Sequence, residues 1–237
     1  MISFKKNIDD NWKKLMSIVD NYFEGEQYDN IMKLHKHFED RIKTAPASGR
    51  PTYHNCFKGG YLDHVIRVTE NALKVKSMFS DMSVKVIHSD SDIVLAAMFH
   101  DLGKVGSIEE DYYVYQTDEW RRNKLSEWYV RNENLEIDSV TDRSLWLLSK
   151  FNIDVSEEVF KAIKLSDGMF SSGNEKSYRR PDNTRNILYY IVHFSDWMST
   201  VSEKQHYLQS LDIDDEVSDE KVENLAELQD AFDKLFD

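Results

Sequence analysis

Apolar residues recur at intervals of three and four along most of the chain, which is the spacing of one face of an α-helix. The pattern occurs twice in the first 45 residues, so we expect two helices joined by a turn at 24–29. The apolar positions are Trp12, Leu15, Met16, Val19 and Phe23, then Ile31, Leu34, His35, Phe38 and Ile42. We interpret His35 and His37 as packing or solvated histidines. The segment is expected to pack as a helical hairpin on the rest of the chain.

Small residues and two prolines interrupt the helical pattern from Thr44 to Pro51, which predicts a loop. After Gly59 and Gly60 a further amphipathic helix is expected. Its apolar stripe comprises Val65, Val68, Ala72, Val75 and Phe79. The next run, 92–99, is almost wholly apolar and predicts a buried helix. Ser89–Ser91 supply its N-cap, and Gly103 is expected to end it in the left-handed conformation.

Helices are also expected at 141–151, at 156–165 with Ser156 as the cap, and from residue 187 onward. The last of these should turn Ile187, Ile191, Phe194, Met198 and Val201 toward the core. An acidic linker at 212–220 and a short helix at 222–236 complete the chain. The sequence therefore predicts an all-α fold with three parts: a hairpin at 1–45, a core domain at 46–210, and a linker with a terminal helix at 211–237.

The amino-acid composition indicates a globular protein without disulfide bonds. With 237 residues, 41% hydrophobic and 31% charged, the chain is typical of a globular domain rather than a disordered segment. Its one cysteine, Cys56, excludes a disulfide framework or a cysteine-based zinc site and is interpreted as a small buried residue. We find neither a signal peptide nor an apolar run long enough to span a bilayer, so we expect a cytoplasmic protein with no membrane contact.

The formal charge of −13 bears on the ligand class. Such a chain repels a phosphate backbone over most of its surface, which disfavours a protein dedicated to long nucleic acid. A small anion held at a local cationic or metal-bearing cleft remains compatible with this charge.

An adjacent histidine and aspartate, His100 and Asp101, close the apolar run and are followed by Gly103 and Lys104. Burying an imidazole beside a carboxylate is costly unless each has a partner, and a divalent metal ion is a partner for both. The alternative is a hydrogen-bonded core pair. His64 and Asp196 lie on other helices that are expected to face the core, and their presence favours the metal site.

The order His64, His100–Asp101, Asp196 resembles that of the HD-domain metal-dependent phosphohydrolases, and the resemblance covers about residues 50–205. It implies a helical bundle in which these four side chains hold one divalent ion. Two imidazoles and two carboxylates suit Mn²⁺, Fe²⁺, Co²⁺, Ni²⁺, Zn²⁺ or Mg²⁺. The resemblance also implies that Asp101 orients the attacking water, and we expect Lys104 to neutralise charge on the phosphate.

A histidine before a Gly-Gly turn is similar to the branch of this superfamily that contains 3′–5′ exoribonucleases, in which that histidine lies at the active site. This makes His54, with Lys58 in the same stretch, a candidate for substrate binding. A loop histidine bonded to the backbone is the alternative for His54. Ser166 stands where two-metal members carry an extra histidine, which argues against a second ion. Asp167 either reaches the site or serves only the end of its helix.

Three further features are candidates for substrate contact. The cationic segment 173–185 includes Arg179 and Arg180, which suit phosphate recognition unless they merely balance neighbouring carboxylates. His193 lies three residues before Asp196 and so shares its helix face. The aromatic and basic insert 107–124 is expected to form either a lid over the site or a surface hairpin.

The sequence therefore predicts a phosphohydrolase acting on a small phosphorylated substrate, with a nucleotide as the first choice. Two alternatives stay open: a phosphodiesterase on a cyclic nucleotide or short RNA ends, and an HD-fold binding module with little turnover. The N-terminal hairpin is open to two interpretations, a surface for forming a homo-oligomer or a cover within one chain.

Overall fold

The computed structural model describes residues 8–171, 173–179 and 186–214. This part of the chain is mostly helical, which confirms the all-α prediction at that level. The α-helices are α1 Ile8–Tyr22, α2 Gly25–Thr44, α3 Gly60–Asp81, α4 Asp90–Phe99, α5 Glu119–Leu125, α6 Val140–Lys150, α7 Glu157–Lys164, α8 Glu175–Tyr178 and α9 Leu188–Asp214. The described residues also form two 3₁₀ turns, η1 Leu102–Val105 and η2 Gly168–Phe170. Two short strands are present as well, β1 Tyr113–Tyr115 and β2 Tyr129–Arg131.

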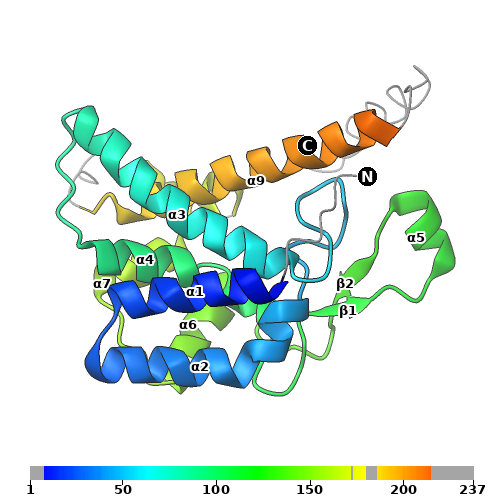
Figure 1. Cartoon of the computed structure of the whole chain (residues 1–237), viewed down its shortest axis with the longest axis horizontal. Coiled ribbons are helices and arrows are strands. Elements are labelled where there is room, and N and C mark those ends of the chain that lie inside the picture. The colour runs from blue at the N-terminus through cyan, green and yellow to red at the C-terminus, as the bar shows by residue number, and fades with distance from the viewer. Residues whose placement is uncertain (1–7, 172, 180–185, 215–237) are drawn as a thin grey trace.

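Helix α4 lies inside the bundle, between α3 and α1 (Figure 1). Every residue from Ile93 to Phe99 is buried, and α1, α3, α7 and α9 all pack against this helix. As predicted, Ser89 caps α4: its hydroxyl accepts from the amide of Asp92, whose carboxylate accepts from the amide of Ser89. A helix that is apolar all round must be surrounded. The residues that follow it therefore emerge among the helices rather than at the surface.

Helices α1 and α2 form the expected hairpin and pack against α3 (Figure 1). The predicted turn at 24–29 is too long, because α2 already begins at Gly25. His35 of α2 is buried between Trp12 and Phe99, and its Nδ1 lies 3.0 Å from the Ile31 carbonyl oxygen. The interpretation of His35 as a packing residue is confirmed. His37 is exposed beside Phe151.

His35 should make stability depend on pH. Burial lowers the pKa of His35 from 6.5 to about 4, so the unfolded chain takes up the proton first as the pH falls. Its stabilising effect is complete above pH 6.5 and is lost between pH 6.5 and 4, a loss of about 3 kcal/mol. Urea unfolding followed by circular dichroism at pH 7 and pH 4.5 measures this. His35→Leu should flatten the dependence, and equal pH dependence in both proteins would contradict the assignment.

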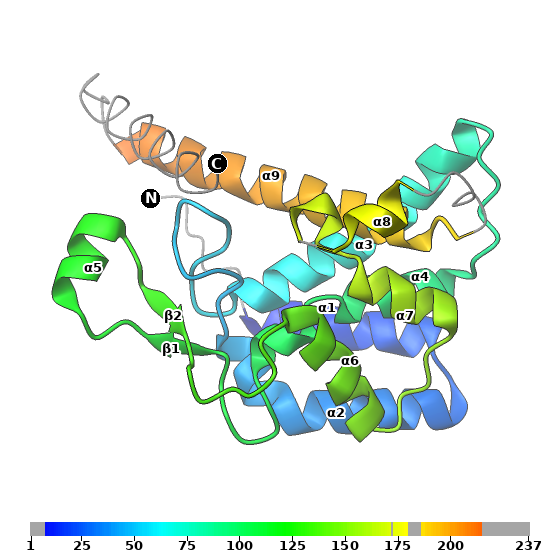
Figure 2. The same ribbon diagram turned by 180° about the vertical axis from the view of Figure 1, so that it is seen from behind.

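Helices α3 and α9 lie against each other along one side of the bundle (Figures 1 and 2). Ile187, Leu188 and Ile191 are buried, but Met198 is 54% exposed and Val201 is 36% exposed. The prediction that Met198 and Val201 face the core is therefore wrong. Helix α9 instead turns Ser195, Ser199 and Glu203 inward, against α3, so the face that carries Met198 and Val201 is left toward solvent.

Helix α9 continues to Asp214, so residues 212–214 are helical rather than part of the predicted acidic linker. The remainder of that linker and the predicted helix at 222–236 lie outside the described residues.

The insert after η1 forms an arm, defined here as residues 113–131, that projects from one end of the bundle (Figure 2). Strands β1 and β2 pair antiparallel, with Val114 opposite Val130, and α5 lies at the tip. Trp120 on α5 is 61% exposed and Tyr115 is 54% exposed. This geometry corresponds to the surface hairpin, not to a lid closed over the site. The base of the arm, at Tyr113, approaches Lys104.

The predicted role of Gly103 needs correction. Helix α4 ends at Phe99, and Gly103 lies within η1 rather than in a left-handed cap. Glycine is required there because a Cβ would lie 2.2 Å from the carbonyl oxygen of Val140 on α6. Gly103 therefore allows η1 to pack closely against α6.

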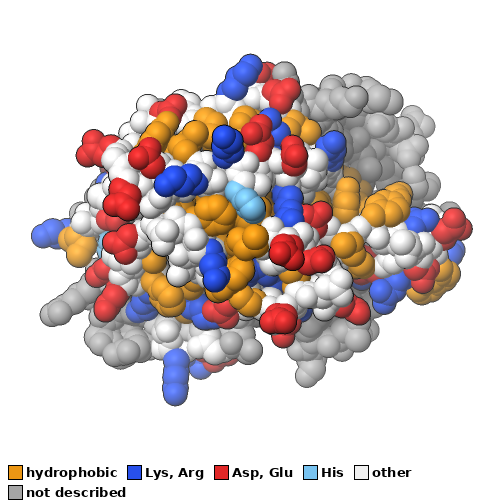
Figure 3. Space-filling model, turned by 90° about the horizontal axis from the view of Figure 1, so that it is seen from below, with side chains coloured by type: hydrophobic (Ala, Val, Ile, Leu, Met, Phe, Trp, Pro, Cys, Tyr) orange, Lys and Arg blue, Asp and Glu red, His pale blue; other side chains and the backbone are white. Residues whose placement is uncertain are grey.

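Acidic and basic side chains are interspersed over the face of the molecule on which α2 lies (Figure 3). Among the residues that the structure describes, no helix is both long enough and apolar enough to cross a membrane.

Candidate metal centre

The four side chains of the predicted ligand set meet between α3, α4 and α9. His64 Nε2 lies 3.2 Å from Asp196 Oδ1 and 3.6 Å from Asp101 Oδ2. His100 Nε2 lies 3.5 Å from Asp101 Oδ2 and 3.8 Å from Asp196 Oδ1. His64, His100 and Asp101 are at most 6% exposed, and the Asp196 side chain is 24% exposed. Two imidazoles and two carboxylates thus face one point that is accessible from the Asp196 side.

The main chain fixes the position of the His100–Asp101 pair. Ser144 on α6 donates its hydroxyl to the His100 carbonyl oxygen and accepts from the Gly103 amide at 2.7 Å. Arg143, which is 1% exposed, donates to the Gly103 carbonyl oxygen. Helix α6 therefore fixes the main chain before and after Asp101, at His100 and at Gly103.

The orientation of the His100 ring follows from one contact. Its Nδ1 lies 2.8 Å from the carbonyl oxygen of Ala97, and a carbonyl can only accept a hydrogen bond. Nδ1 must therefore carry a proton. Nε2, the atom a metal would bind, is left facing the two carboxylates.

Electrostatic interactions at this point favour positive charge. Burial opposes ionisation of Asp196, but the close His100 and His64 rings outweigh it and hold the pKa of this carboxyl well below its usual range. Burial likewise opposes a charge on His64, yet the surrounding carboxylates, Glu203 first, raise its pKa to about 10. A site that attracts protons to nitrogen so strongly also attracts a divalent cation.

The residues fit a metal ion. Nε2 of His64 and Nε2 of His100 are both buried and form no well-made hydrogen bond within the described part of the chain. Their ligand atoms and one from Asp101 all lie within 4.8 Å of one another. Ligands bonded to an ion at about 2.1 Å stand about 3.0–3.4 Å apart, close to the separations seen here. The buried group therefore lies within metal-binding distance.

Lys104 lies inside the site rather than on the surface. Its Nζ is 2.7 Å from Asp101 Oδ2, and its side chain is 15% exposed. Burial opposes the charge on Lys104, but Asp101 and the nearby Tyr113 outweigh it, so the pKa of the ammonium is raised. Lys104 also contributes to holding the pKa of Asp101 below its usual value despite burial.

His54 lies beside His64, with ring centroids 4.8 Å apart. Burial, then the charges of His64 and Lys104, hold the pKa of His54 well below its usual value. Its Nε2 is buried and has no hydrogen-bond partner among the residues the structure describes. The backbone of His54 does bond to Ser48, but the ring belongs to the interior of the site.

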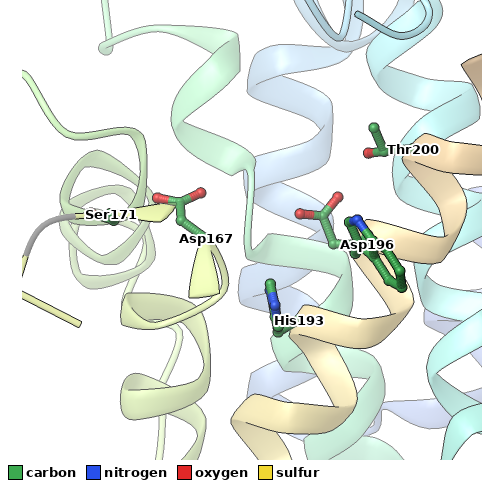
Figure 4. A pocket seen from close by; sticks show the side chains of 6 residues that line it. Asp167, Ser171, His193, Asp196 and Thr200 are labelled. Carbon is green, nitrogen blue, oxygen red and sulfur yellow. The ribbon is translucent and has the colours of Figure 1, made fainter. Parts of the chain in front are cut away.

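A pocket of about 490 Å³ opens beside Asp196. Its lining residues are Asp167, Ser171, His193, Asp196, Trp197 and Thr200. Figure 4 shows the carboxylates of Asp167 and Asp196 on opposite walls, with His193 on the α9 side. Burial first, and then Asp101, raise the pKa of Asp167. The pocket thus reaches Asp196, one of the four converging side chains.

His193 is open to the pocket, whereas the side chain of Ser166 is buried. His193 lines the pocket, and its Nδ1 lies 2.9 Å from the Ser166 carbonyl oxygen. Ser166 itself is buried, and its hydroxyl donates back to Ile163 at 3.0 Å. Ser166 therefore offers no ligand to a second ion.

Two of the substrate-binding candidates lie outside this buried group. Lys58 is exposed in the loop before α3. Arg179 has a side chain that is 73% exposed and pairs with Glu175 at 3.3 Å, as expected of a solvated loop. Arg180 lies outside the described residues.

Sequence reasoning missed Glu203 and Arg67. Glu203 on α9 is 3% exposed, and its carboxylate oxygens lie 3.1 and 3.2 Å from Nδ1 of His64. Arg67 Nε donates to Glu203 at 3.1 Å, and the same guanidinium pairs with Asp63 at 3.0 Å. Spacing was the available signal: Glu203 follows Asp196 by seven residues, about two helical turns, and Arg67 follows His64 by three.

Comparisons with protein families, with curated proteins and with solved structures gave no match.

Proposed function

We propose that the protein is a metal-dependent phosphohydrolase of the HD-domain type, with the HD helical bundle as its fold. Its substrate is a phosphate ester or anhydride of a small molecule, with a nucleotide as the first choice. The observation that carries the proposal is the convergence of His64, His100, Asp101 and Asp196, whose two imidazole Nε2 atoms are buried and face two carboxylates.

One divalent ion is the proposed cofactor, with His64, His100, Asp101 and Asp196 as its ligands. Bound there, it would polarise a phosphoryl oxygen and lower the pKa of a coordinated water. The neighbouring combination of His54, His64 and Glu203 also lies within metal-binding distance. Nδ1 of His64 and Arg67 already satisfy Glu203, so we assign the ion to the other side of the His64 ring.

The other residues of the site suit work on a phosphate group. The ammonium of Lys104 stands ready to neutralise charge that develops on the phosphoryl oxygens, while its contact with Asp101 keeps that carboxylate ionised. Asp101 can orient an attacking water through its second oxygen. His193, Asp167 and Thr200 line the pocket in which the remainder of the substrate would bind.

Phosphate release from nucleoside mono-, di- and triphosphates, with and without added Mn²⁺, Ni²⁺ or Mg²⁺, tests this proposal. Linear and cyclic diesters belong in the same panel. We expect turnover that chelation abolishes and added metal restores. Release from diesters alone would support a phosphodiesterase instead, and bound metal without turnover on any substrate would support a binding module.

A further inference from the structure

The two histidines of the candidate site are oriented by different means. His100 donates from Nδ1 to a main-chain carbonyl, which no side-chain substitution removes. His64 has Glu203 in that place. An ionised carboxylate only accepts hydrogen bonds, so the contact requires a proton on Nδ1 of His64. The orientation of the His64 ring thus depends on one buried side chain.

Glu203 is in turn held by a second group. Arg67 Nε donates to Oε1 of Glu203 at 3.1 Å, while Oε2 lies 3.1 Å from His64 Nδ1. The guanidinium is fixed on its other side by Asp63, which also accepts from Asn55 at 3.2 Å. The carboxylate therefore cannot rotate without breaking the contact with Arg67. Oε1 lies 3.1 Å from Arg67 Nε and 3.2 Å from His64 Nδ1, whereas Oε2 lies 3.1 Å from His64 Nδ1.

We propose that Glu203, oriented by Arg67, is a positioning residue that keeps the proton of His64 on Nδ1 and leaves Nε2 to face Asp101 and Asp196. The consequence for metal binding rests on the proposed function, whereas the position of the proton does not. Hydrogen bonds to the far nitrogen of a ligating histidine commonly change metal affinity 10- to 100-fold.

The substitution Glu203→Gln distinguishes positioning from simple packing. The amide has nearly the shape of the carboxylate, but one of its ends donates. Because Arg67 can only donate, it selects the amide oxygen. The amide NH₂ then takes the place of Oε2, 3.1 Å from Nδ1 of His64, where it requires an acceptor, while the amide oxygen keeps the place of Oε1. We therefore expect His64 to lose the proton on Nδ1 and to carry one on Nε2, the atom that would bind the metal.

Two measurements follow. The ¹⁵N shifts of histidine side chains in the metal-free protein should show a protonated Nδ1 at His64 in the wild type and an unprotonated one in Glu203→Gln. His100 should be unchanged in both and serves as an internal reference. Competition with a chelator should show that the variant binds Mn²⁺ or Co²⁺ about 10- to 100-fold more weakly. Glu70→Gln, a substitution of a half-exposed glutamate on α3, is the matched control and should match the wild type in both.

Replacing Arg67 tests whether this side chain orients the side chain at position 203. In the double variant Arg67→Met/Glu203→Gln the amide is free to turn its oxygen toward His64. We expect this double variant to regain the Nδ1 proton and most of the metal affinity that Glu203→Gln loses. A double variant as weak as the single one would overturn the role of Arg67.

The outcomes separate the two proposals. If the Nδ1 proton moves as expected but the wild type binds no metal, the positioning role stands and the metal-dependent function fails. If the wild type binds metal but Glu203→Gln changes neither the proton nor the affinity, the positioning role is overturned and the metal site remains.

Discussion

Asp101→Ala should abolish both metal retention and phosphate release while leaving the helical circular dichroism spectrum largely intact. Asp101 lies close to both histidines and also pairs with Lys104. Its removal eliminates one proposed ligand and leaves the Lys104 ammonium directed at the remaining ligands. Elemental analysis of the purified protein and the nucleotide panel measure the two effects. Asp81→Ala, which changes an exposed aspartate at the end of α3, is the control and should retain both properties.

Loss of stability must be separated from loss of the site. Removing one partner of a buried ion pair costs about 3–5 kcal/mol, so Asp101→Ala alone will unfold at a lower temperature. The double variant Asp101→Ala/Lys104→Met removes both charges and should recover much of that stability. It should still retain no metal. Unchanged metal content in either variant would count against the assigned ligand set.

The elements that the sequence predicted well are those whose partners are local. The cap at Ser89 and the cap at Ser156 each depend on an amide three residues away, and both form as predicted. The buried stripe of α2 likewise needs only a regular spacing and a surface to cover it. In these cases one segment of sequence contains all the groups that take part.

Features that depend on distant segments were not predictable in the same way. Met198 and Val201 continue the apolar spacing of α9, but the spacing carries no information on which face α3 covers, and α3 covers the face with Ser199 and Glu203. The pairing of β1 with β2 joins residues up to 18 positions apart across an intervening helix, so neither short strand is recognisable alone. In both cases the missing information is which distant segments meet.

The same contrast between local and distant partners applies to the candidate site. His64, His100, Asp101 and Asp196 were named from their order and their helices, and the structure brings them together; their role as ligands stays a prediction. Glu203 was missed because a glutamate on a helix is usually solvated, and only the approach of α3 to α9 buries this one. Glu203 affects the site through its contact with His64, which lies 139 positions away in the sequence.

Gly103→Ala should destabilise the protein and weaken the site together. The added Cβ would lie 2.2 Å from the Val140 carbonyl oxygen and 3.1 Å from the Cβ of Arg143. Because backbone oxygen cannot yield as the end of a flexible side chain can, η1 must move away from α6. Overpacking of this kind costs about 3 kcal/mol, measured by urea unfolding. The movement also strains the bond from the Gly103 amide to Ser144, which anchors the turn that follows Asp101.

Metal affinity separates this effect from ordinary destabilisation. Gly25→Ala is the comparison, because Gly25 has a φ of +59° with open space around it, so the substitution adds backbone strain of about 1–2 kcal/mol and no clash. We expect Gly25→Ala to unfold somewhat more easily and to bind Mn²⁺ as the wild type does. Gly103→Ala should bind Mn²⁺ more weakly even at a temperature where it is fully folded, because Asp101 moves with η1. Equal affinity in the two variants would mean that the packing of η1 on α6 does not position Asp101.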